Sequence, residues 1–367
     1  MQIDFANLKI QHNLYKEEIE EAILKVARDC NFIMGSQIDE LERNLEKFTG
    51  SKYAISCSSG TDALLLAMMA LDIQPDDEII TTPFTFFATA ETIAFLKAKP
   101  VFVDIDEKTY NIDPTKIEEK ITPKTKAIIP VSLYGQPADM DEINQIAKKY
   151  NLKVIVDGAQ SFGSTYKGIS DSNLGDISCT SFFPAKPLGC YGDGGALFTN
   201  DEKLADKIKS LRLHGQSIRY HHQYIGMGGR LDTIQAAVLN VKLKYYEKDL
   251  KLRQDVAEKY TKALNAKNIE TPFVKSDRTS AWAQYSIRVQ NRTELQTKLQ
   301  NLGIPTAVHY PMPLHVQECF KYLNLKEGDF PISEKVSKEI MSLPMNPYVS
   351  DEEIEFIVEN LAKELRC

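Results

Sequence analysis

Short apolar segments alternate with helical segments over residues 53–199, and this alternation limits the possible folds more than any other feature of the chain. Strands separated by single helices form βαβ units, whose strands lie parallel in one sheet with right-handed crossovers. The pattern therefore predicts an α/β domain with a mainly parallel sheet. We expect strands at 53–56, 78–82, 100–103, 126–130, 154–156, 177–183 and 196–199, and helices at 63–71, 88–97, 114–120, 140–149 and 202–211.

The pattern changes on either side of this region. Two amphipathic helices are expected before it, and one long helix is expected to lead into a compact α+β unit. A chain of 367 residues is long enough for one large and one smaller domain. We place a large domain with an N-terminal helical arm at 1–245 and a small C-terminal domain at 246–367. The expected flanking elements are helices 13–30, 37–48, 232–264, 292–302 and 351–365, and strands 283–289, 343–345 and a short one ending at 309–310.

Composition and charge disfavour several classes of protein. The hydrophobic fraction of 43% and charged fraction of 26% are those of an ordinary globular protein, and a net charge of −7 without a long basic block disfavours nucleic acid as a partner. No apolar run is long enough to predict a membrane span. Six cysteines without a CxxC pair predict reduced thiols in the cytoplasm and no zinc site. The adjacent His221 and His222 have no suitably spaced carboxylate, so we expect no metal centre.

An acid and a lysine follow two neighbouring predicted strands. The apolar run Val154–Val156 ends on Asp157, and the strand 177–183 continues into Lys186, which lies between two prolines. Partial burial lowers the pKa of a lysine and makes its amine usable as a nucleophile or base. Such a pair suits pyridoxal phosphate, which needs an amine to form a Schiff base and an acid beside its ring nitrogen. A structural aspartate and a surface lysine on an ordinary α/β sheet fit this stretch equally well.

Two further segments contain candidate cofactor contacts. The turn 57–62 joins a strand to a helix, an arrangement that offers free backbone N–H groups to a phosphate, although Ser and Thr also serve there as plain helix caps. Phe86 and Phe87 follow the strand 78–82. One of the two could lie on a cofactor ring, and the other is expected to fill the core.

Three regions contain candidate substrate contacts. His309 and Tyr310 precede Pro311, which holds them extended, and they point either into an interdomain cleft or into core and solvent. The glycine-dense loop before Arg230 allows close approach of a ligand or of another subunit. Phe32, after the first helix, faces either a ligand or the core.

Taken together, the motifs resemble the nucleotide-sugar aminotransferases of the DegT/StrS group, pyridoxal-phosphate enzymes of fold type I. The resemblance implies a large domain with a mainly parallel seven-stranded sheet flanked by helices, plus a small α+β C-terminal domain. It covers essentially the whole chain. The motifs are FIMGSQIDELE, SSGTDALLLA, TPFTFFATAETI, VDGAQSFG, SFFPAKPLGCYGDGGA, RLDTIQAA and TAVHYPMPL.

The resemblance also implies a role for each matching residue. Lys186 resembles the Schiff-base lysine and Asp157 the partner of the pyridine nitrogen. Gln160 resembles the side chain near the ring hydroxyl, and Phe86 takes the stacking position. The phosphate would be held by Gly60, Thr61 and Ser181. The family works as homodimers, in which the RLDTIQAA loop of one subunit completes the other subunit's site.

The chain is most similar to the branch that acts on UDP-linked 3-keto sugars. The resemblance implies transfer of an amino group from L-glutamate to C3 of a UDP-2-acetamido-2-deoxy-3-oxo-hexose or hexuronate, for cell-surface polysaccharide such as O-antigen. Arg230, His309 and Tyr310 would touch the sugar nucleotide, and Cys30 and Phe32 would line it. Two positions depart from the branch: Ala185 replaces a serine and Gly228 an asparagine, which bears on affinity and on sugar choice.

Other functions are less compatible with these residues. A dTDP-3-keto-6-deoxyhexose is the main rival acceptor, and a non-catalytic regulator on the same scaffold would bind the cofactor without turnover. A related sugar 3-dehydratase would have histidine in place of Lys186. A dinucleotide-dependent oxidoreductase is disfavoured because no GxGxxG follows an early strand.

Overall fold

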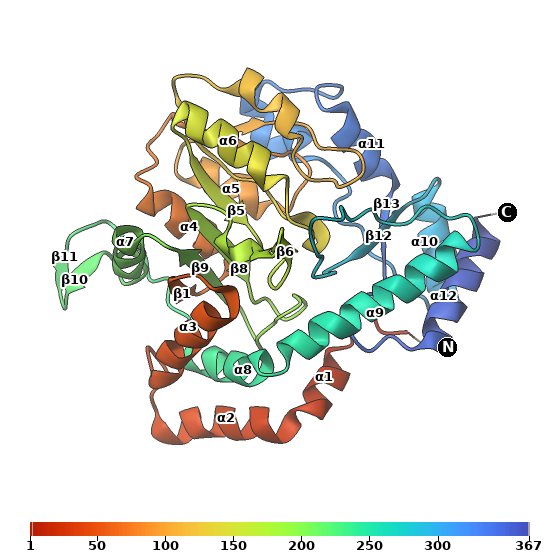
Figure 1. Cartoon of the computed structure of the whole chain (residues 1–367), viewed down its shortest axis with the longest axis horizontal. Helices are drawn as coiled ribbons and strands as arrows, with labels where there is room; N and C mark the ends of the chain where they lie inside the picture. The colour runs from red at the N-terminus through yellow and green to blue at the C-terminus, as the bar shows by residue number, and fades with distance from the viewer. Residues whose placement is uncertain (2, 366–367) are drawn as a thin grey trace.

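A seven-stranded sheet forms the centre of the chain in the computed structural model, which describes residues 1 and 3–365 (Figure 1). Its strand order is β1-β9-β8-β5-β4-β2-β3, and all neighbouring pairs are parallel except those made by β9, which runs opposite to β8 and β1. The expectation of a mainly parallel seven-stranded sheet is confirmed. The strands are β1 Tyr53–Cys57, β2 Glu78–Thr81, β3 Lys99–Phe102, β4 Thr125–Ile128, β5 Lys153–Asp157, β8 Ile177–Ser181 and β9 Gly195–Thr199.

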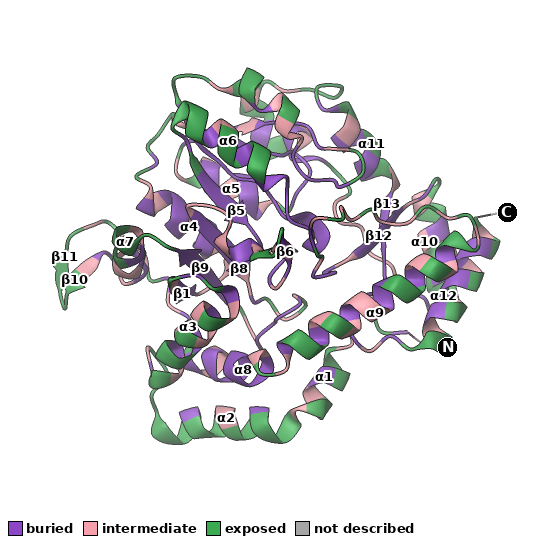
Figure 2. Cartoon of the chain, in the orientation of Figure 1, coloured by how far each residue is buried: buried purple, intermediate pink, exposed green. Residues whose placement is uncertain are grey.

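Helices cover both faces of this sheet, which explains why its strands are nearly continuous apolar runs (Figure 2). In β5, Ile155 faces the core shared with α4 and α7, whereas Val154 and Val156 face the core shared with α6. The faces thus alternate with the period of two expected of a strand. The covering helices are α3 Ser36–Thr49, α4 Gly60–Ala70, α5 Ala88–Phe95, α6 Met140–Tyr150, α7 Glu202–Arg212 and α8 Thr233–Leu243.

A second core lies in the C-terminal part of the chain, around the antiparallel pair β12–β13. Ile3 from the opposite end of the sequence belongs to this core, and its N–H donates to the carbonyl of Gly303 at 3.2 Å. If the chain is divided at 245/246, Ile3 near the N-terminus therefore packs against the C-terminal domain and not against the large domain. The elements are α9 Tyr246–Asn265, β12 Tyr285–Arg288, α10 Arg292–Asn301, α11 Pro331–Glu339, β13 Ile340–Leu343 and α12 Asp351–Glu364.

Several predicted elements were wrong in detail. The helix expected at 13–30 is two helices, α1 Leu8–Leu14 and α2 Lys16–Asp29, and the helix expected at 232–264 is divided into α8 and α9. The helix expected at 114–120 is a pair of 3₁₀ turns, and the strand expected to end at 309–310 is a single bridge between Ala307 and Ser342. The segments not anticipated are α11, the hairpin β10 Gln216–Ile218 with β11 His221–His222, and the pair β6 Thr165–Tyr166 with β7 Ile169–Ser170.

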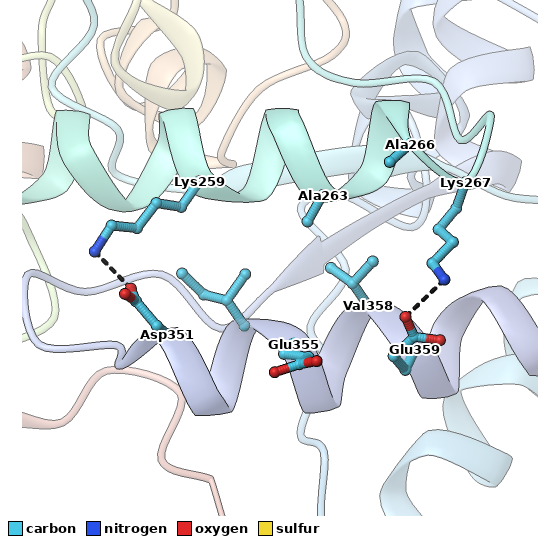
Figure 3. A pocket seen from close by; sticks show the side chains of 9 residues that line it. Lys259, Ala263, Ala266, Lys267, Asp351, Glu355, Val358 and Glu359 are labelled. Atoms are coloured by element: carbon cyan, nitrogen blue, oxygen red, sulfur yellow. Dashed lines mark hydrogen bonds and ion pairs between the residues drawn. The ribbon is translucent and has the colours of Figure 1, made fainter.

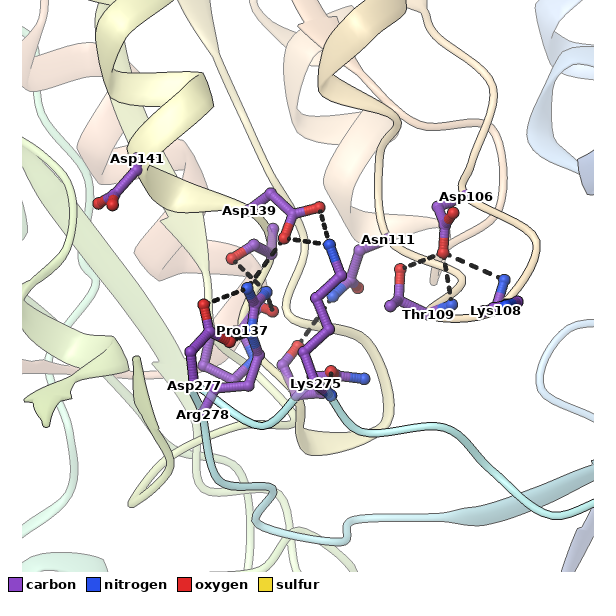
Figure 4. A network of polar contacts seen from close by, with 12 residues as sticks. Asp106, Lys108, Thr109, Asn111, Pro137, Asp139, Asp141, Lys275, Asp277 and Arg278 are labelled. Carbon is purple, nitrogen blue, oxygen red and sulfur yellow. Dashed lines mark hydrogen bonds and ion pairs between the residues drawn. The ribbon is translucent and has the colours of Figure 1, made fainter. Parts of the chain in front are cut away.

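Hydrogen bonds and ion pairs connect residues 272–280 to the start of α6 (Figure 4). Asp139, at the N-terminus of α6, looks from sequence like a helix cap, but its side chain caps no backbone N–H. It accepts instead from Lys275 at 2.7 and 2.8 Å and pairs with Arg278 at 2.9 Å. Arg278 also donates to the carbonyls of Pro137 and Ala138. The chain between the two cores is thus held to the large domain by ionic contacts.

Among the helices of residues 1 and 3–365, none has the length and apolar character needed to cross a membrane. The same residues contain no cluster of three or more His, Cys, Asp or Glu side chains arranged to hold a metal ion.

Candidate active site

A cavity of about 490 Å³ opens at the carboxyl ends of β5 and β8, where an open α/β sheet binds its ligands. Nine of the candidate site residues predicted from sequence line it, although their positions in the chain range from residue 60 to residue 310. These residues are Gly60, Thr61, Phe86, Asp157, Gln160, Ser181, Lys186, His309 and Tyr310.

Asp157 is the last residue of β5 and is only 5% exposed. The sheet fixes its backbone, because its N–H donates to Pro130 and its carbonyl accepts from Ser132. Its carboxylate accepts from the Thr89 hydroxyl at 2.7 Å and from the Ala159 N–H at 3.2 Å. Burial raises the pKa of Asp157, while these two hydrogen bonds and the charge of Lys186 oppose the rise. A cationic ligand group beside this carboxylate would be strongly favoured.

Lys186 lies in the tight turn that follows β8. Its N–H donates to the carbonyl of Phe183 at 2.8 Å, and a Cβ at Gly189 would lie 2.4 Å from the carbonyl oxygen of Pro184, so the turn requires glycine there. Lys186 is partly buried and lines the cavity. Burial lowers the pKa of Lys186, and the negative charge of Asp157 opposes the change. An amine of this kind is more readily deprotonated than one on the surface, as nucleophilic or basic catalysis requires.

The N-terminus of α4 closes one end of the cavity. Ser59 caps the helix by accepting from the Asp62 N–H at 3.0 Å, so the N–H groups of Gly60 and Thr61 have no partner within the helix. A Cβ at Gly60 would lie 2.7 Å from the Cβ of Ser181, so the helix start and the end of β8 are in close contact. Unpaired N–H groups, the positive end of the helix dipole and the Ser181 hydroxyl together suit a phosphate.

The structure separates Phe86 from Phe87. Phe86 lines the cavity and is 54% exposed, with its ring centroid 6.0 Å from that of Tyr310. Phe87 packs in a separate apolar cluster, 5.7 Å from the ring of Phe320. Only Phe86 can therefore present a ring face to a ligand in the cavity.

Gln160 and Tyr310 form a second polar wall. The Gln160 side chain accepts from the N–H of Tyr134 at 2.7 Å and donates to the Tyr310 hydroxyl at 3.0 Å. His309 bonds through Nδ1 to the Ser342 hydroxyl at 2.9 Å. Burial and the charge of Lys186 lower the pKa of His309 to about 4, so its imidazole is neutral at neutral pH. The wall thus presents neutral hydrogen-bonding groups.

Phe32 and Arg230 do not line this cavity in the single chain. The segments that contain them are in contact, since Ile33 pairs with Asp232 and the N–H of Thr233 donates to the carbonyl of Phe32 at 2.9 Å. Phe32 is 46% exposed, and Cys30 before it is also exposed.

Some residues in and behind the cavity were not singled out from sequence. Thr85 lines the cavity, and its hydroxyl bonds at 3.0 Å to that of Thr89, four positions further on, which in turn bonds to Asp157. Asp193 and Gln284 also line the cavity, and the buried Oε1 of Gln284 receives no hydrogen bond from the part of the chain that the structure describes. The i, i+4 spacing of the two threonines is a visible signal, whereas Gln284 reaches the site only through tertiary packing.

A second depression, of about 390 Å³, lies between α9 and α12 (Figure 3). It is flanked by two pairs of exposed side chains, Lys259 with Asp351 at 2.5 Å and Lys267 with Glu359 at 2.6 Å. These four charges are paired with one another, and solvent screens both pairs. This groove therefore offers no reactive group comparable to Lys186.

The cavity residues fit pyridoxal phosphate. Unpaired N–H groups at α4 suit the phosphate, Phe86 suits the flat ring, Asp157 suits a protonated ring nitrogen, and Lys186 supplies an amine with a lowered pKa. These groups converge although no two of them come from the same secondary-structure element.

Comparison with known proteins gives the same assignment. The family model described as "DegT/DnrJ/EryC1/StrS aminotransferase family" matches residues 13–362. The chain is 51% identical to UDP-2-acetamido-2-deoxy-3-oxo-D-glucuronate aminotransferase of Pseudomonas aeruginosa, over 97% of this chain and 98% of that one. It is 42% identical to dTDP-3-amino-3,6-dideoxy-alpha-D-galactopyranose transaminase of Aneurinibacillus thermoaerophilus, over 97% and 98%.

Solved structures agree with this result. The crystal structure of NtdA from Bacillus subtilis with bound cofactor PMP superposes with a TM-score of 0.92 at 32% identity, covering 100% of this chain and 86% of that one. The family depends on pyridoxal phosphate. The chain belongs to the DegT/DnrJ/EryC1/StrS aminotransferase family.

Proposed function

We propose that this protein transfers an amino group from L-glutamate to the C3 ketone of a UDP-2-acetamido-2-deoxy-3-oxo-hexuronate or hexose, with pyridoxal phosphate as cofactor. The observation that carries the proposal is that Lys186 and Asp157 line one cavity at the ends of adjacent strands. The sugar is proposed from the 51% identity with the Pseudomonas aeruginosa enzyme. The amino sugar would enter a cell-surface polysaccharide such as lipopolysaccharide O-antigen.

Each cavity residue has a defined part in this reaction. When bound, pyridoxal phosphate supplies an electron-withdrawing ring that stabilises negative charge at the carbon next to the transferred nitrogen. Asp157 would accept a hydrogen bond from the ring nitrogen and favour its protonated form. The Lys186 amine would hold the cofactor and would serve as the general base and acid that moves protons.

The surrounding residues would bind and orient the cofactor and the sugar substrate. Gly60, Thr61 and Ser181 hold the phosphate, and Phe86 covers one face of the ring. Gln160 is placed for the ring hydroxyl, since Tyr134 and Tyr310 fix its amide. The neutral His309 is suited to hydrogen bonding with sugar hydroxyls.

We propose further that the protein acts as a homodimer and that Arg230 and Phe32 reach the partner's cavity. Their position outside their own chain's cavity supports this. Arg230 would bind a carboxylate or the diphosphate through its planar guanidinium group. Gly228 cannot supply the amide of asparagine, so only its backbone is left for a contact across the interface, and Ala185 likewise offers no hydroxyl.

A mixing experiment tests the shared site. Lys186→Ala and Arg230→Ala homodimers are each expected to be inactive or nearly so. After subunit exchange, a mixed dimer contains one site with both residues, and partial activity should return. No recovery despite demonstrated exchange would contradict a site shared between subunits.

The sugar is tested by direct competition among acceptors. The purified protein, supplied with pyridoxal phosphate and L-glutamate, is given the UDP-3-keto-glucuronate, its analogue with an unoxidised C6, and a dTDP-3-keto-6-deoxyhexose, and products are identified by mass spectrometry. We expect the first to be aminated with the highest kcat/KM. Preference for the third would favour the function printed for the 42% identical relative. Cofactor binding without amine transfer to any of them would favour a regulator.

We also place the reaction in the cytoplasm. The five cysteines that the structure describes are free thiols, as expected in a reducing compartment.

A further inference from the structure

Asp171 is a second buried carboxyl group close to Asp157, and the reaction described above does not use it. It begins the 3₁₀ turn η4, Asp171–Asn173, and is 1% exposed. Its Oδ1 accepts from the Ser132 hydroxyl at 2.9 Å, and its Oδ2 accepts from the Ser161 hydroxyl. A buried carboxylate without a cation is costly, so its retention needs an explanation.

The two serines belong to the segments that build the cavity wall. Ser132 lies in the segment after β4, which also contains Val131 of the cavity and Tyr134, the donor to Gln160. Ser161 directly follows Gln160 in the segment after β5. One carboxyl group therefore joins the two segments that position Gln160.

Asp171 also contacts the backbone next to Asp157. A Cβ at Gly158 would lie 2.9 Å from Oδ2 of Asp171, which leaves no room for a side chain between the two acids. The charge of Asp157 acts on Asp171, and burial together with that charge raises the pKa of Asp171 to about 6, against the hydrogen bonds from the serines.

Few other titratable groups adjoin this pair. Lys186 acts on Asp157 from the turn after β8. Cys179 on β8 accepts the N–H of Gly158 through its carbonyl, and burial raises the pKa of its thiol, which is therefore uncharged. Asp157 is thus the charge to which Asp171 couples.

We propose that Asp171 is a positioning residue for the amino-transfer reaction: it fixes the segments that carry Asp157 and Gln160, and its negative charge reinforces Asp157 in keeping the cofactor ring protonated. The inference rests on the proposed function, because it takes Asp157 as the partner of the ring nitrogen.

The coupling predicts a pH dependence with a definite sign. Above about pH 6 Asp171 is ionised, and a second negative charge favours protonated groups in the cavity. Below that pH Asp171 is neutral and the reinforcement is lost. Asp171→Asn preserves the size of the side chain and one acceptor oxygen, replaces the other oxygen with an N–H donor, and is neutral at every pH.

The test is a pH titration of the absorbance of the cofactor-loaded holoenzyme. We expect Asp171→Asn to lower the midpoint of the absorbance change by roughly half a pH unit, because protonated cofactor nitrogens lose a favourable charge. We expect kcat to fall roughly 3- to 10-fold at neutral pH, with the decrease vanishing toward pH 5, where the wild-type group is also neutral. Asp176→Asn is the matched control. Its carboxylate pairs with Lys153 and the Val154 N–H at the opposite end of the strands, and the midpoint should not move.

A second variant keeps the inference testable if Asp171→Asn folds poorly. Ser132→Ala removes one donor to the ionised carboxyl, so the pH at which Asp171 titrates should rise, as should the pH below which kcat declines. If the wild type is active and coloured, and both variants show the same absorbance titration and the same pH profile as the wild type, the inference is overturned and the proposed function is not. A wild type that takes up no chromophore would overturn the proposed function as well.

Discussion

Two buried carboxylates of this chain have opposite surroundings. Asp139, 9% exposed, is paired with the cations Lys275 and Arg278 (Figure 4). Asp157, 5% exposed, accepts from a hydroxyl and from a backbone N–H. The charge of Asp139 is neutralised by the fold itself. Among the residues that the structure describes, Asp157 forms no ion pair, and burial raises its pKa.

This difference distinguishes a structural acid from a functional one. A buried ion pair satisfies both of its members and leaves nothing for a ligand. A buried acid that is held in place without a cation is costly to the fold and gains stability when a cationic ligand arrives. Burial alone would not separate the two residues, but their partners do.

The largest effect should come from Lys186, the one cation whose charge acts on Asp157. Lys186→Ala should reduce amine transfer at least about 1000-fold and abolish covalent attachment of the cofactor, because both nucleophile and proton carrier are lost. Steady-state turnover and borohydride trapping measure the two losses. Lys275→Ala, which removes a cation from Asp139, is the matched control and should leave trapping intact. Turnover within tenfold of wild type after Lys186→Ala would contradict the assignment.

Asp157→Asn should reduce kcat about 100- to 1000-fold, since an amide cannot stabilise a protonated ring nitrogen as a carboxylate does. The same change should raise the melting temperature of the cofactor-free protein at neutral pH. The folded pKa of Asp157 is raised, so ionisation above that pKa destabilises the native state, and an amide avoids that cost. Calorimetry without cofactor checks the sign. A lower melting temperature would mean that the carboxylate is needed by the fold.

Asp139→Asn should have the opposite effects: the protein should become less stable, and turnover should be retained. Loss of this carboxylate leaves Arg278 with its remaining bonds to Asp277, Pro137 and Ala138, and leaves Lys275 without its partner. We expect a loss of about 2 to 3 kcal/mol in the free energy of unfolding, at the low end for a buried pair because Lys275 is partly exposed. Turnover at a temperature where the variant is folded should stay close to wild type. A selective loss of kcat without a loss of stability would make Asp139 part of the catalytic machinery.

Sequence patterns were sufficient to predict a mainly parallel sheet and to place Asp157 and Lys186 after neighbouring strands, whereas their proposed roles came from the resemblance to a known family. The run Val154–Val156 and the strand before Lys186 are apolar enough to be recognised, and adjacency of β5 and β8 then brings Asp157 and Lys186 to one edge. The direction of β9 was not anticipated. Its reversal follows from the short connection after Lys186, which returns antiparallel beside β8 without a crossover helix.

Other features depend on contacts that local patterns do not encode. The apolar spacing of 232–264 continues through Lys244 and Tyr245, yet α8 packs on the large domain and α9 on the second core, so the helix divides between them. The choice of Phe86 over Phe87 needed the resemblance to a known family, and the structure places only Phe86 in the cavity. From sequence Asp139 looks like a helix cap and Asp157 like the end of a strand, but the ionic partner Lys275 of the one and the hydroxyl partner Thr89 of the other are tertiary contacts that no local pattern predicts.

The smallest predicted effect concerns Thr89, whose hydroxyl donates a hydrogen bond to Asp157, whereas Asp139 is contacted by cations. Its donated bond of 2.7 Å lowers the pKa of the carboxyl, so Thr89→Val should raise that pKa while the Ala159 N–H still holds the other oxygen. One hydrogen bond to a charged group corresponds to roughly a tenfold change in kcat/KM. The acid limb of the pH profile should move to higher pH, because more of Asp157 is protonated at a given pH.

Thr89→Ser keeps the donor and should restore the wild-type profile. Thr85→Val removes only the neighbouring hydroxyl and should have a smaller effect. A Thr89→Val variant with the wild-type profile would show that the hydrogen bond from Thr89 does not set the pKa of Asp157.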